Sequence, residues 1–197
     1  MKKLLITGFE PFGGSDINSS WETAARLEMQ SFGGIELIVK KLPVSFKRAG
    51  DDIREILTDL RPDALIMLGQ RGNGQSVDIE RIAVNLMDSA NPDNDGYCPQ
   101  EQRIADDGDS AYFSNIPVKI LRDALMSRGI PAKVSNSAGL YVCNSTYYNA
   151  LNEIYEQHLQ TKVVFVHLPK LDDKFTVDFL VDSVQAIIEN CINTTKR

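Results

Sequence analysis

The run Val163-Val164-Phe165-Val166-His167-Leu168-Pro169 is the clearest structural signal in the sequence. Its apolar residues are mostly β-branched or aromatic, which is typical of a buried strand. His167 falls near the end of this expected strand, where a sheet meets the space above it. The run therefore indicates both a sheet and a place where chemistry could occur.

Similar short apolar runs alternate with longer segments of helical periodicity. The expected strands are 3–7, 36–42, 64–68, 77–84, 132–135 and 163–167. The expected helices are 20–30, 46–59, 118–128, 144–157 and 177–193, and apolar residues recur at helical spacing in several of them. This alternation predicts an α/β fold, a three-layer sandwich with a largely parallel central sheet and helices on both faces.

Length and charge limit the class of protein. The 197 residues suit one domain spanning 1–197, and 43% hydrophobic residues suffice for a sizeable core. The formal net charge is −6, and the lysines and arginines are scattered. We therefore expect no binding to nucleic acid, because no basic stripe offsets the repulsion of a polyanion.

No apolar stretch approaches the length that a membrane span needs, so we expect no membrane association. The apolar run after Lys2 and Lys3 is too short for the core of a signal peptide. We therefore expect a cytoplasmic protein, whose thiols stay reduced. Cys98, Cys143 and Cys191 lie far apart, which argues against a zinc site or a disulfide framework.

The segment 87–111 interrupts the alternation of strands and helices. It is rich in Asn, Asp, Gly and Pro, which favour turns. We expect a long surface excursion, and long loops of this kind inside compact domains are often functional.

A glycine-rich turn, Thr7-Gly8-Phe9-Glu10-Pro11-Phe12-Gly13-Gly14, follows the first expected strand directly. Open α/β sheets place ligands at such strand ends. The turn matches neither the dinucleotide fingerprint nor the P-loop, and its two phenylalanines could instead form an apolar wall. The alternative is a loop whose aromatic rings fill the core.

Cys143 lies between an expected strand and an expected helix. The partial positive charge of a helix N-terminus favours a thiolate over a thiol, and a thiolate is a strong nucleophile. Neighbouring backbone amides could also hold the oxyanion of a tetrahedral intermediate. The alternative is a buried structural thiol, the commoner fate of a lone cysteine.

His167 could act as a general base if it met such a thiol. An imidazole then needs an acceptor that fixes its tautomer, and Glu80 is a candidate because it is a carboxylate among apolar neighbours. The alternatives are a satisfied histidine at the edge of the core and a structural salt bridge of Glu80, for example with Arg81. His158 lies in a polar helical stretch, and we expect it to be exposed to solvent.

At these residues the sequence resembles the type I pyroglutamyl peptidases, also called pyrrolidone-carboxylate peptidases. The resemblance is collinear from about residue 4 to about residue 170. The motifs that carry it are Thr7-Gly8-Phe9-Glu10-Pro11-Phe12-Gly13-Gly14, Asn18, Ser20-Trp21-Glu22, Glu80-Arg81, Ala83, Pro92-Asp93-Asn94, Ala111-Tyr112-Phe113-Ser114, Gly129-Ile130-Pro131-Ala132, Ser135-Asn136-Ser137-Ala138-Gly139, Val142-Cys143-Asn144 and His167-Leu168-Pro169.

The resemblance implies a cysteine peptidase that releases pyroglutamate from the N-terminus of peptides through a thioester. It implies Cys143 as nucleophile, His167 as base and Glu80 as the residue that orients the imidazole. It further implies a pocket for the lactam ring, a twisted central sheet, no metal or organic cofactor, and a homo-oligomer that is frequently a tetramer. The residues it assigns to the pocket are Phe9, Phe12, Asn18, Gln70 and Val142.

Two positions depart from the family pattern. Family members often carry Arg two residues after the position of Asp88, where this chain has Ala90. Arg71, after Gln70, is also unusual. These departures leave open a second function, a non-catalytic binder of pyroglutamyl or related small ligands. An enzyme resembling nucleoside phosphorylases ranks last, because the sequence offers no evident phosphate cradle.

Overall fold

A computed structural model describes residues 1–193, so residues 194–197 of the expected domain lie outside the described part. Eight strands and five helices follow one another within the described residues. They are β1 (Lys2–Phe9), α1 (Ser19–Glu28), β2 (Ile35–Leu42), α2 (Phe46–Leu60), β3 (Ala64–Arg71), β4 (Val77–Glu80), β5 (Ile82–Val84), β6 (Ala111–Phe113), α3 (Val118–Ser127), β7 (Ala132–Ser135), α4 (Val142–Glu156), β8 (Lys162–Pro169) and α5 (Val177–Asn193).

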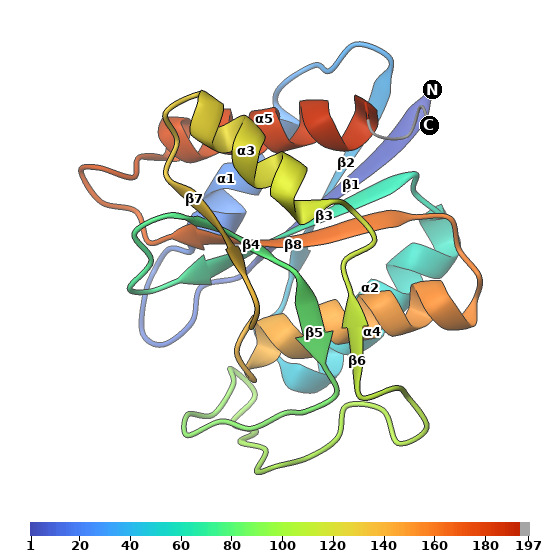
Figure 1. Cartoon of the computed structure of the whole chain (residues 1–197). Coiled ribbons are helices and arrows are strands. Elements are labelled where there is room, and N and C mark those ends of the chain that lie inside the picture. The colour runs from blue at the N-terminus through green and yellow to red at the C-terminus, as the bar shows by residue number, and fades with distance from the viewer. Residues whose placement is uncertain (194–197) are drawn as a thin grey trace.

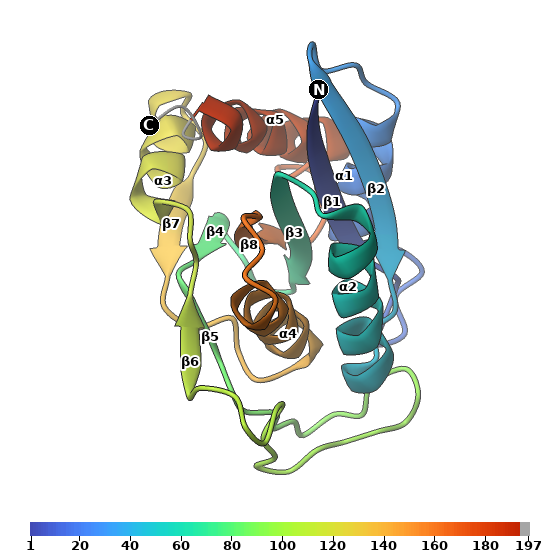
Figure 2. The ribbon, with the colours of Figure 1, turned by 90° about the vertical axis from the view of Figure 1, so that its right-hand side faces the viewer.

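Six strands form the central sheet in the order β2-β1-β3-β8-β4-β7. The strands β2, β1, β3 and β8 are mutually parallel, as predicted. The strand β4 runs antiparallel to β8, and β7 runs parallel to β4. The sheet is therefore mostly parallel, with two reversed strands at one edge (Figure 2).

Successive residues of the central strands point to opposite faces of the sheet, and both faces are covered. Leu4 and Ile66 pack in one apolar cluster with residues of α1, α3 and α5. Leu5 and Met67 pack in a second cluster with residues of α2 and α4. Figure 1 shows the three helices above the sheet and the other two below it. This arrangement confirms the predicted α/β layers.

Burial on both faces explains why the strand sequences are continuously apolar. Every residue of β8 from Val163 to Pro169 is buried. Full burial of one Val, Leu or Phe side chain contributes about 1.5–3 kcal/mol. No helix among the described residues is long and apolar enough to cross a membrane.

The expected strand 77–84 is wrong as a single element. It is two strands in different sheets, because the chain leaves the central sheet at Arg81. The backbone N–H of Arg81 donates to Ser135 O, and its carbonyl accepts from Ser114 N. After this point β5 pairs with β6 in a separate two-stranded sheet. Both halves are apolar and contiguous, so periodicity alone did not show the break.

The segment 87–111 is a long loop, as expected, and its last residue begins β6. One antiparallel bridge joins Met87 to Gln102 inside it. Asn85 fixes its far end, because its Oδ1 accepts from the backbone N–H groups of Ile104 and Ala105. The loop is thus tied to the body of the fold by the Asn85 side chain and by backbone hydrogen bonds such as that from Asn94 N to Val44 O.

Gly8 permits the close approach of α1 to the end of β1. A Cβ atom there would lie 2.6 Å from Ser20 O and 2.9 Å from Trp21 Cα, which are backbone atoms of α1. We expect Gly8→Ala to lower the free energy of unfolding by about 1–3 kcal/mol through overpacking. Urea titration measures this loss.

Gly33→Ala is the matched control, because a Cβ at Gly33 has no heavy atom within 4 Å. We expect it to change the free energy of unfolding by no more than about 0.5 kcal/mol. Equal effects of the two substitutions would show that the approach of α1 to β1 is not close-packed.

Candidate active site

Cys143 is the second residue of α4, which begins at Val142, two residues earlier than expected. Tyr141 occupies the N-cap position and makes no side-chain capping hydrogen bond. The first backbone N–H groups of the helix therefore remain available near the thiol. The helix N-terminus also favours negative charge at this point.

Gly69, near the end of β3, leaves room for the thiol. A Cβ atom there would lie 3.1 Å from Cys143 Sγ and 2.7 Å from the ring of Phe165. Gly69 is also the strand partner of His167 in the β3–β8 pairing. The sulfur of α4 therefore lies over the same part of the sheet as the imidazole.

His167 lies on β8 and is 4% exposed. Its Nδ1 lies 2.7 Å from Glu80 Oε1, and Glu80 is fully buried. The carboxylate accepts, so Nδ1 carries the donated proton and Nε2 is left for the thiol of Cys143. The structure thus brings the three predicted residues together from β4, α4 and β8.

The reversed direction of β4 produces this contact. In the antiparallel pairing Glu80 lies opposite Phe165, and His167 is two residues further on the same face. Diagonal neighbours of this kind are within reach of long side chains. Arg81, the partner suggested for a structural salt bridge, makes no ion pair with Glu80, whereas Arg71 does.

The pKa of His167 reflects these neighbours. Burial of the ring lowers it, but the charge and hydrogen bond of Cys143, followed by the hydrogen bond and charge of Glu80, raise it more. The resulting pKa of His167 is about 9. An imidazolium beside a sulfur is therefore favoured near neutral pH.

A pocket of about 330 Å³ opens beside Cys143 and His167. All five residues assigned to it by resemblance line it, namely Phe9, Phe12, Asn18, Gln70 and Val142. Its walls are mainly apolar, with few polar groups, which suits a small uncharged ligand. Its volume leaves room for a small ring and the atoms attached to it.

Asn18 and Gln70 differ in how much hydrogen-bonding capacity they have left. Asn18 caps α1, because its Oδ1 accepts from Ser20 N at 3.0 Å and its Nδ2 donates to Glu10 O. Gln70 Oε1 accepts from Ser19 N at 2.8 Å. Gln70 Nε2 has no hydrogen-bond partner among the described residues. Gln70 is therefore the freer donor at the pocket.

The rim of the pocket is held by Glu10 and Asn94. Glu10 Oε1 accepts from Val44 N and from Asn94 Nδ2, both at 2.9 Å. Asn94 Nδ2 also donates to Pro11 O. These contacts join the glycine-rich turn, the segment before α2 and the long loop. The motif Pro92-Asp93-Asn94 is visible in the sequence, but this contact of Asn94 could not be predicted from it.

Six further residues line the pocket and were not predicted as site residues, namely Val44, Arg71, Gly72, Ala138, Gly139 and Tyr141. Tyr141 packs against Phe12 with ring centroids 6.4 Å apart, and its hydroxyl donates to Pro92 O. Its position two residues before Cys143 was the only available signal. Ala90 is exposed and does not line this pocket.

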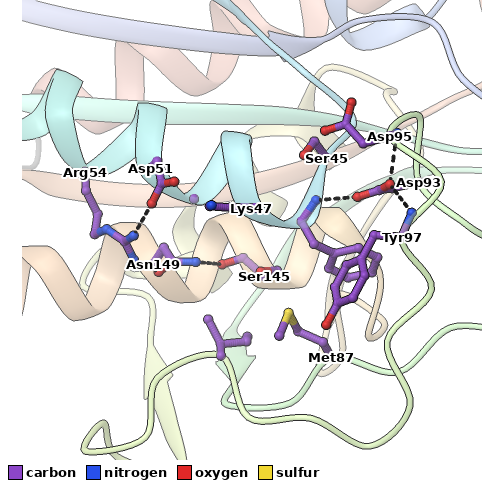
Figure 3. A pocket seen from close by; sticks show the side chains of 13 residues that line it. Ser45, Lys47, Asp51, Arg54, Met87, Asp93, Asp95, Tyr97, Ser145 and Asn149 are labelled. Carbon is purple, nitrogen blue, oxygen red and sulfur yellow. Dashed lines mark hydrogen bonds and ion pairs between the residues drawn. The ribbon is translucent and has the colours of Figure 1, made fainter.

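A second cavity, of about 440 Å³, lies between α2, α4 and the long loop (Figure 3). Figure 3 shows Arg54 turned toward Asp51 and Asn149, with which it forms hydrogen bonds. No cysteine or histidine lines this cavity. Among residues 1–193 no group of three His, Cys, Asp or Glu side chains could hold a metal ion.

Comparisons with known proteins identify the family of this chain. A family model described as pyroglutamyl peptidase matches residues 2–192. The pyrrolidone-carboxylate peptidase of Thermococcus onnurineus is 42% identical over 87% of this chain and 86% of its own length. That of Bacillus cereus is 37% identical over 88% of this chain and 81% of its own length.

Solved structures show the same relationship. The pyrrolidone carboxyl peptidase of Thermococcus litoralis superposes with a TM-score of 0.95 at 31% identity, covering 100% of this chain and 96% of its own. The pyroglutamyl peptidase I of Bacillus amyloliquefaciens gives 0.91 at 31% identity, covering 98% of both chains. The chain therefore belongs to the pyroglutamyl peptidase family.

Proposed function

We propose that this protein is a cysteine peptidase that hydrolyses the amide bond after an N-terminal pyroglutamyl residue. Cys143 is the nucleophile, His167 the general base and Glu80 the group that orients the imidazole. The observation that carries this assignment is the buried 2.7 Å contact between His167 and Glu80 beside Cys143, at the mouth of a mainly apolar pocket.

The proposed reaction starts from the pair in which the proton of Cys143 has passed to His167. The thiolate attacks the pyroglutamyl carbonyl, and backbone N–H groups at the start of α4 stabilise the oxyanion. His167 then gives the proton to the departing amine, which leaves a thioester on Cys143. Water activated by His167 attacks the thioester and releases pyroglutamate.

The pocket suits a pyroglutamyl ring because that ring carries no charged amino group. Phe9 and Phe12 supply apolar walls, and Gln70 Nε2 supplies a donor for the lactam carbonyl. An acidic pocket of the kind that binds a free ammonium group would gain nothing from this substrate. These features support peptides with an N-terminal pyroglutamyl residue as the substrate class.

We also propose a cytoplasmic location and a homo-oligomer, which by resemblance to the family is a tetramer. All three cysteines are free, and a thiol nucleophile is preserved where thiols stay reduced. Phe113 and Tyr155 are large apolar side chains that are 66% and 60% exposed, and such side chains suit contacts between subunits.

Cys143→Ser tests the nucleophile. We expect hydrolysis of a pyroglutamyl amide carrying a fluorophore to fall on the order of 10³-fold or more, because a hydroxyl at this position is not ionised as a thiol is. Cys98→Ser is the control, since Cys98 is exposed and outside the pocket. Turnover unchanged by Cys143→Ser would refute the role, and saturable binding without hydrolysis by the wild type would favour the non-catalytic binder.

Glu80→Gln tests the orienting residue. The carboxylate of Glu80 raises the pKa of His167, so we expect the substitution to lower that pKa from about 9 by roughly one unit or more. Nuclear magnetic resonance of the two histidine rings measures this change, and the exposed His158 is the internal reference. An unmoved pKa of His167 would show that Glu80 does not act on the imidazole.

Light scattering at micromolar concentration tests the oligomer. We expect the mass of a tetramer, and we expect Phe113→Ser to reduce the associated fraction if this exposed ring lies at a subunit contact. A wild-type protein that is monomeric throughout the concentration range would contradict the proposal.

A further inference from the structure

Arg71, the last residue of β3, reaches two carboxylates on the neighbouring part of the sheet. Its Nη1 donates to Asp78 Oδ2 at 2.8 Å, and its Nη2 lies 3.5 Å from Glu80 Oε1. Asp78 and Glu80 are two residues apart on β4, so their side chains point to the same face of the sheet, and both are fully buried. Two buried carboxylates so close together need a cation, and Arg71 supplies it.

The same guanidinium also reaches the segment that precedes Cys143. Its Nη2 donates to Ser137 O at 3.2 Å. The side chain is 33% exposed and lines the pocket together with Cys143 and His167. Arg71 therefore links the ends of β3 and β4 with the loop that leads to the nucleophile.

Glu80 has few other contacts that could fix its carboxylate. Its Oε1 accepts from both His167 and Arg71, whereas the buried Oε2 has no partner among the described residues. The orientation of the carboxylate toward the imidazole is therefore set by the ring on one side and the guanidinium on the other. Lys133 lies 3.4 Å from Asp78 but forms no ion pair with Glu80.

We propose that Arg71 is a positioning residue of this peptidase, holding the Glu80 carboxylate against the His167 ring and fixing the loop before Cys143. Its effect on turnover rests on the proposed function, whereas its effect on His167 does not. Arginine suits this position because its planar fork can donate to Asp78, Glu80 and Ser137 O together.

Because Arg71 contacts the carboxylate that holds the ring, we expect its charge to act on the protonation of His167 as well. The titratable and charged groups around the His167 ring and the Glu80 carboxylate come from four elements. They are Cys143 and Tyr147 of α4, Asp78 and Glu80 of β4, Arg71 of β3 and Lys133 of β7, which acts through Asp78. The carboxylates favour an imidazolium and the guanidinium opposes it. Loss of the guanidinium should therefore make His167 more basic.

The test compares Arg71→Met with Arg71→Lys. For Arg71→Met we expect kcat for a pyroglutamyl amide to fall roughly 10- to 100-fold, with a smaller change in KM, because the catalytic groups are misplaced. We expect the pKa of His167, followed by nuclear magnetic resonance, to rise by about one unit. Arg71→Lys keeps the charge, so we expect it to leave that pKa near its wild-type value and to restore only part of kcat.

The proposal is overturned if Arg71→Met leaves both kcat and the pKa of His167 unchanged. It is also overturned if the Met and Lys variants lose kcat equally while that pKa stays fixed, because a merely structural role would produce this pattern. A wild type that hydrolyses no pyroglutamyl amide would refute the proposed function, and the titration of His167 would still decide whether Arg71 acts on the ring.

Asp78→Asn is a second variant in which the pKa of His167 is measured, and it replaces Arg71→Met if that variant does not fold. It removes a negative charge and frees Arg71 to pair with Glu80 alone, so we expect the pKa of His167 to fall. A rise or no change in that pKa would overturn the proposal. Circular dichroism of each variant confirms that the fold is retained.

Discussion

The site depends on one buried contact, the hydrogen bond between His167 and Glu80. Burying a carboxylate and an imidazole is unfavourable unless each satisfies the other. The antiparallel pairing of β4 and β8 meets this condition, since it places both side chains on one face of the sheet. With Nδ1 held in this way, the remaining ring nitrogen faces the sulfur at the start of α4.

The surrounding fold provides space and charge for this pair. Gly69 leaves room for the sulfur over β3, and the N-terminus of α4 supplies backbone N–H groups beside it. Glu10 and Asn94 join three loops at the rim of the pocket. Catalytic groups are thus fixed by regular elements, while the substrate pocket is enclosed by loops that hydrogen bonds tie together.

Much of this arrangement could be predicted from the sequence, because continuous apolar strands and periodic helices specify the layers. The apolar run correctly indicated a buried strand at 163–167. Their pattern could not give the direction of β4, nor the departure of the chain from the sheet at Arg81, because both depend on pairing between distant segments. Resemblance supplied the pocket residues, whereas the contact of Arg71 with Glu80 depends on the tertiary structure.

The central claim is that Cys143 forms a covalent thioester with the pyroglutamyl group. The most direct measurement is mass spectrometry of the enzyme after acid quenching during turnover of a pyroglutamyl ester. The account predicts a mass increase of one pyroglutamyl group, located on the peptide that contains Cys143. Turnover with no adduct on Cys143, under conditions in which hydrolysis of the acyl-enzyme limits the rate, would contradict it.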